Sequence, residues 1–265
     1  DELAEAVALT KVPSHRTKGE GYHTWLERKP VKLTIYATIA ILIGGIVQII
    51  PTLLVKSNIP TISSVKPYTP LELEGRDLYI REGCVGCHSQ MIRPFRSEVE
   101  RYGEYSKAGE YVYDHPFLWG SKRTGPDLHR VGQKYNDNWH LNHMYDPQST
   151  SPGSIMPGYK WLYDNKAMDH SLIEKKMEAM VTLGVPYTDE DIKNARSNMD
   201  AQAAGIEKSL YGDPDFVKSY EESKNNARVR GEEFVPMKDR EIVALISYLQ
   251  RLGKDIKVKE TVQNK

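Results

Sequence analysis

The residues best suited to chemistry lie in one short stretch, REGCVGCHSQMIRPF, at residues 81–95. It holds Cys84 and Cys87, the two cysteines of the chain, and His88 follows them directly. Two thiols at this spacing could form a disulfide, half of a zinc site, a redox dithiol or the thioether anchors of a haem. In the last case the adjacent histidine ligates the iron through Nε2 from the same turn. The order Cys-x-x-Cys-His favours covalent haem attachment, with His88 as the proximal ligand.

A second axial ligand is expected on the opposite haem face, and a methionine thioether there raises the reduction potential. Eight methionines are available. Met156 lies in the loop STSPGSIMPGYKWL, whose prolines and glycines can hold a thioether in a fixed place. We predict that Met156 is the distal ligand, with Met144 as the reserve. The alternative for Met156 is a side chain that caps a hydrophobic loop, whereas Met177 and Met180 lie in an amphipathic run and are expected in the core.

Residues that support the ligands can also be predicted. In SKRTGPDLHRVG, the carbonyl of Pro126 could accept the Nδ1–H of His88, which would fix the ring and increase its basicity. An ordinary turn would explain the Gly-Pro step equally well. Arg93 and Arg123 are candidate partners of the haem propionates, because guanidinium groups suit bidentate pairing with carboxylates. Solvated surface charge is the alternative for both.

The segment between these motifs is less specific. Its aromatic residues could be interface anchors, since aromatics are enriched at interfaces, or core residues: Tyr113, Phe117 and Trp119. Its histidines are expected to be ordinary hydrogen-bonded residues rather than ligands: His115, His129, His140 and His143.

An apolar segment, VKLTIYATIAILIGGIVQIIPTLLV at residues 31–55, precedes the chemical site. Its uncharged part, 33–50, would span about 27 Å as a helix, close to the roughly 30 Å hydrocarbon core of a bilayer. A buried core helix would need a large apolar surrounding, and the rest of the chain is polar. A signal peptide would be shorter and end in a cleavage site, whereas a linker rich in Pro and Ser follows here. We predict a single transmembrane anchor.

The basic residues around this segment predict its orientation. Those on its amino side outnumber those just after it: Lys11, Arg16, Lys18, Arg28, Lys29 and Lys32 against Lys56 and Lys66. Because positive charge concentrates on the cytoplasmic side, the amino end is expected in the cytoplasm and the remainder outside.

Two further segments are expected to be helices that position the site. PLELEGRDLYIREG places Gly75 and Tyr79 on one helical face. MKDREIVALISYLQRLG has apolar residues at helical spacing and ends at Gly253. The small Gly75 would let a large side chain such as Leu245 or Tyr248 approach closely, so the two helices are expected to cross at the haem edge.

These motifs together resemble a known family. The paired helices, Cys-x-x-Cys-His, Gly-Pro and late Met are similar to the cytochrome c fold. The match is tighter to the mono-haem cytochrome c subunit (CcoO/FixO, subunit II) of cbb3-type cytochrome c oxidase. The residues that carry it are REGCVGCHSQMIRPFRSEVERYG, YDHPFLWGSKRTGPDLHRVG, SIMPGYKWL and TLGVPYTDEDI, with GGIVQIIP in the anchor and ALISYLQRLG near the end.

The resemblance implies a mainly α protein, with one N-terminal transmembrane helix followed by a class I-like cytochrome c domain with a family-specific insertion. The expected parts are a cytoplasmic polar arm at 1–30, the transmembrane anchor at 31–55, a linker at 56–70, a periplasmic cytochrome c domain at 71–254 and a C-terminal tail at 255–265. The insertion at 193–236 is charged and helix-prone, and is expected to be solvated or to contact a neighbouring subunit.

The resemblance also implies a function. One covalent haem c would take electrons from a di-haem cytochrome c subunit and pass them to the low-spin haem b of the catalytic haem-copper oxidase subunit, which reduces oxygen to water and pumps protons. The chain would lie in the lipid bilayer of a bacterial inner membrane and do no bond chemistry itself. The family's catalytic subunit holds a calcium ion near its haem propionates, and Ser121 is expected to approach that ion. With 36 acidic and 36 basic residues, no nucleic-acid partner is expected.

Other functions remain open at this point. One is the anchored mono-haem subunit of a nitric oxide reductase, against which the HPFLWGSKRTGPDL block argues. A haem-based gas sensor would need Met156 to be absent from the iron. A non-haem dithiol oxidoreductase would need Cys84 and Cys87 to be free.

Overall fold

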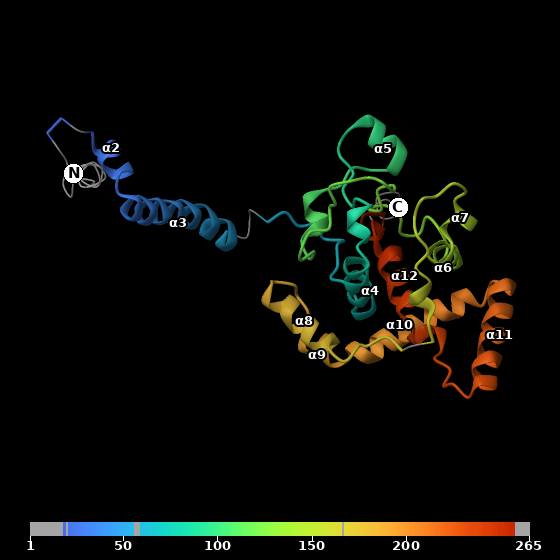
Figure 1. The fold of residues 1–265 in the computed structure, drawn as a ribbon. Coiled ribbons are helices and arrows are strands. Elements are labelled where there is room, and N and C mark those ends of the chain that lie inside the picture. Colours follow the sequence, from blue (N-terminus) through green and yellow to red (C-terminus); the bar gives the residue numbers. More distant parts are fainter. Residues whose placement is uncertain (1–17, 20, 56–58, 166, 258–265) are drawn as a thin grey trace, which may run out of the picture. The chain divides into compact units, whose positions relative to one another are not determined.

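The computed structural model describes residues 18–19, 21–55, 59–165 and 167–257. Most of the arm predicted at 1–30, the start of the linker at 56–58 and the end of the tail at 258–265 lie outside the described residues, as do Lys11, Arg16 and Lys56. The described residues form helices and no strand, which confirms the mainly α class. The chain divides into two compact units, Asp1–Ile59 and Pro60–Lys265 (Figure 1).

The first unit consists mainly of α3 (Pro30–Leu54), which follows the short α2 (Tyr22–Glu27). Pro30 stands in the first turn of α3, where the N–H that a proline lacks would have no partner in the helix. The helix continues past Pro51 to its last turn, so the proline does not end it.

α3 is a candidate membrane-spanning helix. Its stretch Pro30–Thr52 is long and apolar enough to cross a bilayer, and none of its most apolar part is buried within the structure. The hydroxyl groups of Thr34 and Thr52 donate to carbonyls one turn earlier, each at 2.9 Å. These hydroxyl groups are therefore satisfied inside the helix, as a lipid surrounding requires.

The core of the second unit is the crossing of α4 (Pro70–Arg81) with α12 (Glu241–Arg251), which Figure 1 shows side by side. A Cβ on Gly75 would lie 1.9 Å from the carbonyl oxygen of Ala244 and 2.8 Å from Cβ of Tyr248. The predicted close crossing at Gly75 is confirmed, and its nearest partner is the backbone of Ala244 rather than a large side chain. Only a residue without a side chain allows this approach.

α4 begins at a capping box. Thr69 Oγ1 accepts from the backbone N–H of Glu72 at 3.3 Å, and Glu72 Oε2 accepts from the backbone N–H of Thr69 at 2.8 Å. This pair satisfies donors that the first turn would otherwise leave unpaired. It fixes the start of the helix whose other end leads into Cys84.

Shorter helical elements and loops cover this pair. The bounds are η2 (Cys84–Gly86), α5 (Arg96–Tyr102), η3 (Ala108–Tyr111), α6 (Asp137–Tyr145), α7 (Pro147–Thr150), η4 (Lys160–Tyr163), α8 (Ile173–Thr182), α9 (Asp189–Lys193), α10 (Ala195–Leu210), α11 (Pro214–Arg230) and η5 (Met237–Asp239).

The segment at 193–236 is helical, as predicted, but it is not simply solvated. α10 packs against α4 and α12, and it buries Ala195, Met199, Ala203 and Leu210 in the hydrophobic core of the second unit. α11 buries Phe216, Tyr220 and Ala227. The apolar residues of α10 recur every three or four positions among many charges, and this spacing explains why one face is buried.

Candidate functional site

The two cysteines and the histidine share one compact turn at the end of α4. Gly83 adopts a left-handed backbone (φ 73°) and directs the chain out of the helix into η2. The backbone N–H groups of Cys87 and His88 both donate to the carbonyl of Cys84, at 3.2 and 2.9 Å. Cys84 is buried and Cys87 exposed, and they are not joined in a disulfide.

The environment of Cys84 helps to decide between haem attachment, a redox dithiol and half of a zinc site. Burial, with a smaller contribution from Glu82, raises the pKa of the Cys84 thiol to about 12. A thiol with a raised pKa is a poor nucleophile, so Cys84 would not be the attacking thiol of a redox dithiol. In the described part of the chain, no group of three or more His, Cys, Asp or Glu side chains could hold a metal ion, so the half zinc site finds no further ligands there.

His88 is held by the carbonyl of Pro126. Its Nδ1 lies 2.8 Å from that oxygen, so Nδ1–H donates and Nε2 is left to bind a metal. Burial lowers the pKa of His88, against the opposing effect of the Pro126 carbonyl. The neutral imidazole, which is the form that ligates metals, is therefore favoured.

Glycines make room for this ring and its backbone. A Cβ on Gly125 would lie 2.2 Å from Cε1 of His88, and a Cβ on Gly120 would lie 2.6 Å from the His88 carbonyl oxygen. The backbone N–H of Gly125 also donates to the carbonyl of Cys87 at 2.9 Å. The loop thus lies flat against the histidine because it has no side chain at these positions.

Met156 lies in a loop that is attached to α6. The backbone N–H of Tyr159 donates to the carbonyl of Met144 at 2.7 Å, and Ser154 Oγ accepts from the backbone N–H of Met156 at 3.2 Å. Met156 is half-buried and packs beside the core, whereas the side chain of Met144 is buried within it. An accessible thioether on an anchored loop suits a distal ligand better than a packed one, so Met156 stays the predicted ligand.

These residues fit a covalently bound haem. The compact turn presents Cys84, Cys87 and His88 together, and the geometry leaves His88 Nε2 free. Gly125 leaves open the space beside the His88 imidazole that a Cβ would otherwise fill. Met156 supplies a soft thioether of the kind that haem iron accepts.

A column of stacked rings at the start of α6 was not predicted, and its first ring, Tyr135, lies just before the helix. Trp139 stacks on Tyr135 (ring centroids 3.9 Å apart) and on His143 (4.5 Å). His143 Nδ1 lies 2.6 Å from Thr150 Oγ1. Burial lowers the pKa of His143, which favours its neutral form. The spacing of four residues in the sequence, from Tyr135 to Trp139 to His143, was the available signal.

Both candidate propionate partners are paired with Glu98. Arg123 Nη2 lies 2.7 Å from Glu98 Oε2, and Arg93 forms a second ion pair with the same carboxylate. Arg123, followed by Arg93, holds the pKa of Glu98 at about 2. Arg123 also donates from Nε to Ser89 Oγ at 2.7 Å. The structure therefore gives both guanidinium groups an internal partner, and contact with a propionate stays a prediction.

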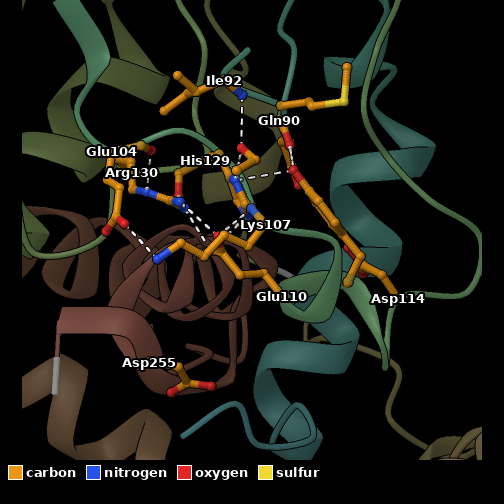
Figure 2. Close-up of polar contacts among 12 residues, drawn as sticks. Gln90, Ile92, Glu104, Lys107, Glu110, Asp114, His129, Arg130 and Asp255 are labelled. Atoms are coloured by element: carbon orange, nitrogen blue, oxygen red, sulfur yellow. Dashed lines mark hydrogen bonds and ion pairs between the residues drawn. The ribbon is translucent and has the colours of Figure 1, made fainter. Parts of the chain in front are cut away.

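A buried polar cluster lies beside the attachment segment (Figure 2). His129 Nδ1 lies 2.6 Å from Ser106 Oγ and 3.2 Å from Tyr111 Oη, and Tyr111 Oη donates to the carbonyl of Gln90 at 2.7 Å. Burial lowers the pKa of His129, so the ring is neutral. This histidine is hydrogen-bonded and internal, in agreement with the expectation for the segment.

Two aromatic side chains are exposed close to the same segment. Phe117 and Trp119 stack with ring centroids 4.6 Å apart, and they remain 52% and 39% exposed. The carbonyl of Trp119 accepts from the backbone N–H of Gln90 at 2.9 Å. Tyr113 is half-buried against the core, and Ser121 is exposed. The interface and calcium roles predicted for this region stay predictions.

Comparison with known proteins gives one family. The family model described as "Cytochrome C oxidase, mono-heme subunit/FixO" matches residues 23–256. A search of curated proteins found no match. The family match covers the candidate membrane helix and the second unit as far as residue 256.

Proposed function

Because the chain belongs to the mono-haem FixO subunit family of cytochrome c oxidase, we propose that it relays electrons within a cbb3-type oxidase of a bacterial inner membrane. Membership makes the chain a subunit of an oxidase complex, and this subunit carries one haem. The finer assignment, to a cbb3-type complex and to one step of its electron transfer, is our proposal.

The observation that carries the proposal is the arrangement around His88. Its Nδ1 is held 2.8 Å from the Pro126 carbonyl, directly beside two thiols that form no disulfide. Cys84 and Cys87 would form the thioether bonds, His88 would be the proximal ligand and Met156 the distal one. When bound, the haem supplies a one-electron couple between ferric and ferrous iron.

The residues of the chain would orient this group and exclude water from it. The Pro126 carbonyl holds the imidazole and would increase its basicity, and the Met156 loop would help to exclude water from the bound haem. No side chain is assigned to bond chemistry on a substrate, so we expect no independent catalysis by this subunit.

The partners follow from this role. A di-haem cytochrome c subunit would donate electrons, and the low-spin haem b of the catalytic haem-copper subunit would receive them before oxygen is reduced to water. α3 would anchor the chain in the bilayer, with the amino end cytoplasmic and the haem domain periplasmic. The exposed Phe117 and Trp119 support a protein interface near the haem, and Ser121 in the same loop would approach the calcium ion of the catalytic subunit.

The proposal is tested by the order of oxidation in the intact complex. When the fully reduced complex meets oxygen, we expect haem b to be oxidised first and then re-reduced as the c-type haem of this chain is oxidised. Rapid absorption measurements at the two α bands resolve these steps. A c-type haem that is oxidised more slowly than the complex turns over would contradict the relay.

A further inference from the structure

We propose that Asp127 is a positioning residue that lowers the reduction potential of the haem, by holding the Pro126 carbonyl on His88 and by placing a negative charge beside it. This inference rests on the proposed function, because it needs His88 to be the proximal ligand. Asp127 was not among the residues that the sequence singled out.

The carboxylate of Asp127 joins the ligand segment to the Gly-Pro loop. Its Oδ2 accepts from Ser89 Oγ at 2.6 Å and from the backbone N–H of Met91 at 2.9 Å, and its Oδ1 accepts from the backbone N–H of His129 at 2.9 Å. Ser89 follows His88 directly, and Asp127 follows Pro126 directly. The carboxylate therefore links the residues next to both partners of the His88 hydrogen bond.

Backbone bonds make the same two segments run together. The N–H of Gly125 donates to the carbonyl of Cys87 at 2.9 Å, and the N–H of Leu128 donates to the carbonyl of Ser89 at 2.8 Å. Asp127 lies between these two bonds and its side chain is buried. Movement of the carboxylate would therefore move the Pro126 carbonyl relative to the imidazole.

The charge of Asp127 is only partly compensated. Both of its oxygens face donors, which suits the ionised form, because an ionised carboxylate is an acceptor only. The nearest cation is Arg123, whose Nη2 lies 3.5 Å from Oδ2 but 2.7 Å from Glu98. Ser89 bridges the two groups, since it donates to Asp127 and accepts from Arg123 Nε at 2.7 Å.

The sign of the effect follows from two contributions. A negative charge near the iron stabilises the ferric state, and a stronger hydrogen bond to Nδ1 makes the imidazole a better donor to ferric iron. Both lower the reduction potential. Removing the charge of Asp127 should therefore raise it.

The test uses the purified intact complex and a spectroelectrochemical titration of its c-type α band, in which the haem of this chain is the component whose midpoint differs between wild type and variant, because the di-haem subunit contributes to the same band. Asp127→Asn is expected to shift the midpoint potential to more positive values. Ser89→Ala removes one of the three hydrogen-bond donors to the carboxylate and leaves its charge less compensated, so it is expected to shift the potential to more negative values. Asp191→Asn is the matched control, because it removes the same charge from a carboxylate that accepts from the N–H and hydroxyl of Thr188 at 2.8 and 2.7 Å, and no shift is expected.

Opposite shifts distinguish a charge from mere loosening of the loop, which would move both variants in the same direction. An unchanged potential in Asp127→Asn, or shifts of the same sign, would overturn the inference. If Asp127→Asn does not assemble, Ser89→Ala decides alone, and an unchanged or raised potential would overturn it. A wild-type complex whose band for this chain carries no covalent haem would instead contradict the proposed function.

Discussion

At the scale of single residues, His88 is defined by what surrounds it. Pro126 takes one ring nitrogen, Gly125 leaves room for the ring face, and Asp127 ties the two segments together. Each of these residues restricts the imidazole in a different way. The free nitrogen therefore points in one direction before any metal is bound, and such preorganisation is what a ligand needs.

Gly125→Ala should reduce covalent haem incorporation. The added Cβ would lie 2.2 Å from Cε1 of His88, so either the ring or the loop must move. Haem staining relative to the amount of assembled chain measures the effect. The control is Gly205→Ala in α10, where a Cβ meets nothing within 4 Å. That change should keep haem content and stabilise the helix by about 0.5–1 kcal/mol.

Met156→Ala should lower the midpoint potential of the c-type haem, because a thioether ligand favours the ferrous state. The titration used for Asp127 measures this shift. Met144→Ala is the control: its side chain is buried, so the free energy of unfolding should fall by about 2–5 kcal/mol while the potential holds. A drop in potential for Met144→Ala alone would transfer the ligand role to that residue.

At the scale of elements, the second unit is held by α4, α12 and α10 together. α4 carries the attachment turn at its end, and α12 supports it through the contact at Gly75. α10 adds a third helix to this core, and Gln202 Nε2 donates to Ser247 Oγ at 2.9 Å across the boundary with α12. The charged segment at 193–236 therefore stabilises the domain that holds the site.

Met199→Ala tests this role of α10. Met199 is 3% exposed, so the loss of its side chain should lower the free energy of unfolding by about 2–5 kcal/mol. Lys208→Ala changes an exposed residue of the same helix and should alter it by less than about 0.5 kcal/mol. The stability of the two variants is compared by thermal or denaturant unfolding of the complex, which is followed by the absorption of the c-type haem. Equal stability of the two variants would mean that α10 is dispensable.

At the scale of the whole molecule, an apolar helix and a haem-binding unit serve different purposes. Ile41 in the middle of α3 is 73% exposed, although an aliphatic side chain in water gains nothing from exposure. In a lipid bilayer the exposed apolar side chains of α3 contact lipid instead of water. The second unit carries its own core and presents the attachment turn at the end of a core helix.

Ile41→Asp should reduce the fraction of the chain that stays in membranes after alkaline extraction. A carboxylate near the centre of a spanning helix costs about 2.5–3.5 kcal/mol on insertion. Val229→Asp is the matched control, since Val229 is 78% exposed on α11 in the other unit. Its membrane retention should equal that of the wild type. Equal loss from both variants would argue against α3 as the anchor.

Much of the fold and of the candidate site could be predicted from the sequence, because both depend on patterns among residues that are close together in the chain. The spacing of Cys84, Cys87 and His88 is local, and the hydropathy of α3 is continuous. The roles of Asp127 and Met199 were missed for a different reason. Asp127 acts through partners far away in sequence, Ser89 and Met91, and Met199 sits among charges that conceal an apolar face. Contacts between distant segments leave no periodic signal in a single sequence.

The most direct test of the central claim is a haem stain of the purified native complex on a denaturing gel, together with its reduced-minus-oxidised spectrum. The account predicts a stained band at the mass of this chain, a c-type α band, and oxygen-reducing activity in the same preparation. Cys84→Ala combined with Cys87→Ala should abolish the stain. An unstained wild-type band from a complex that has matured fully would contradict covalent haem attachment and return both cysteines to thiol chemistry.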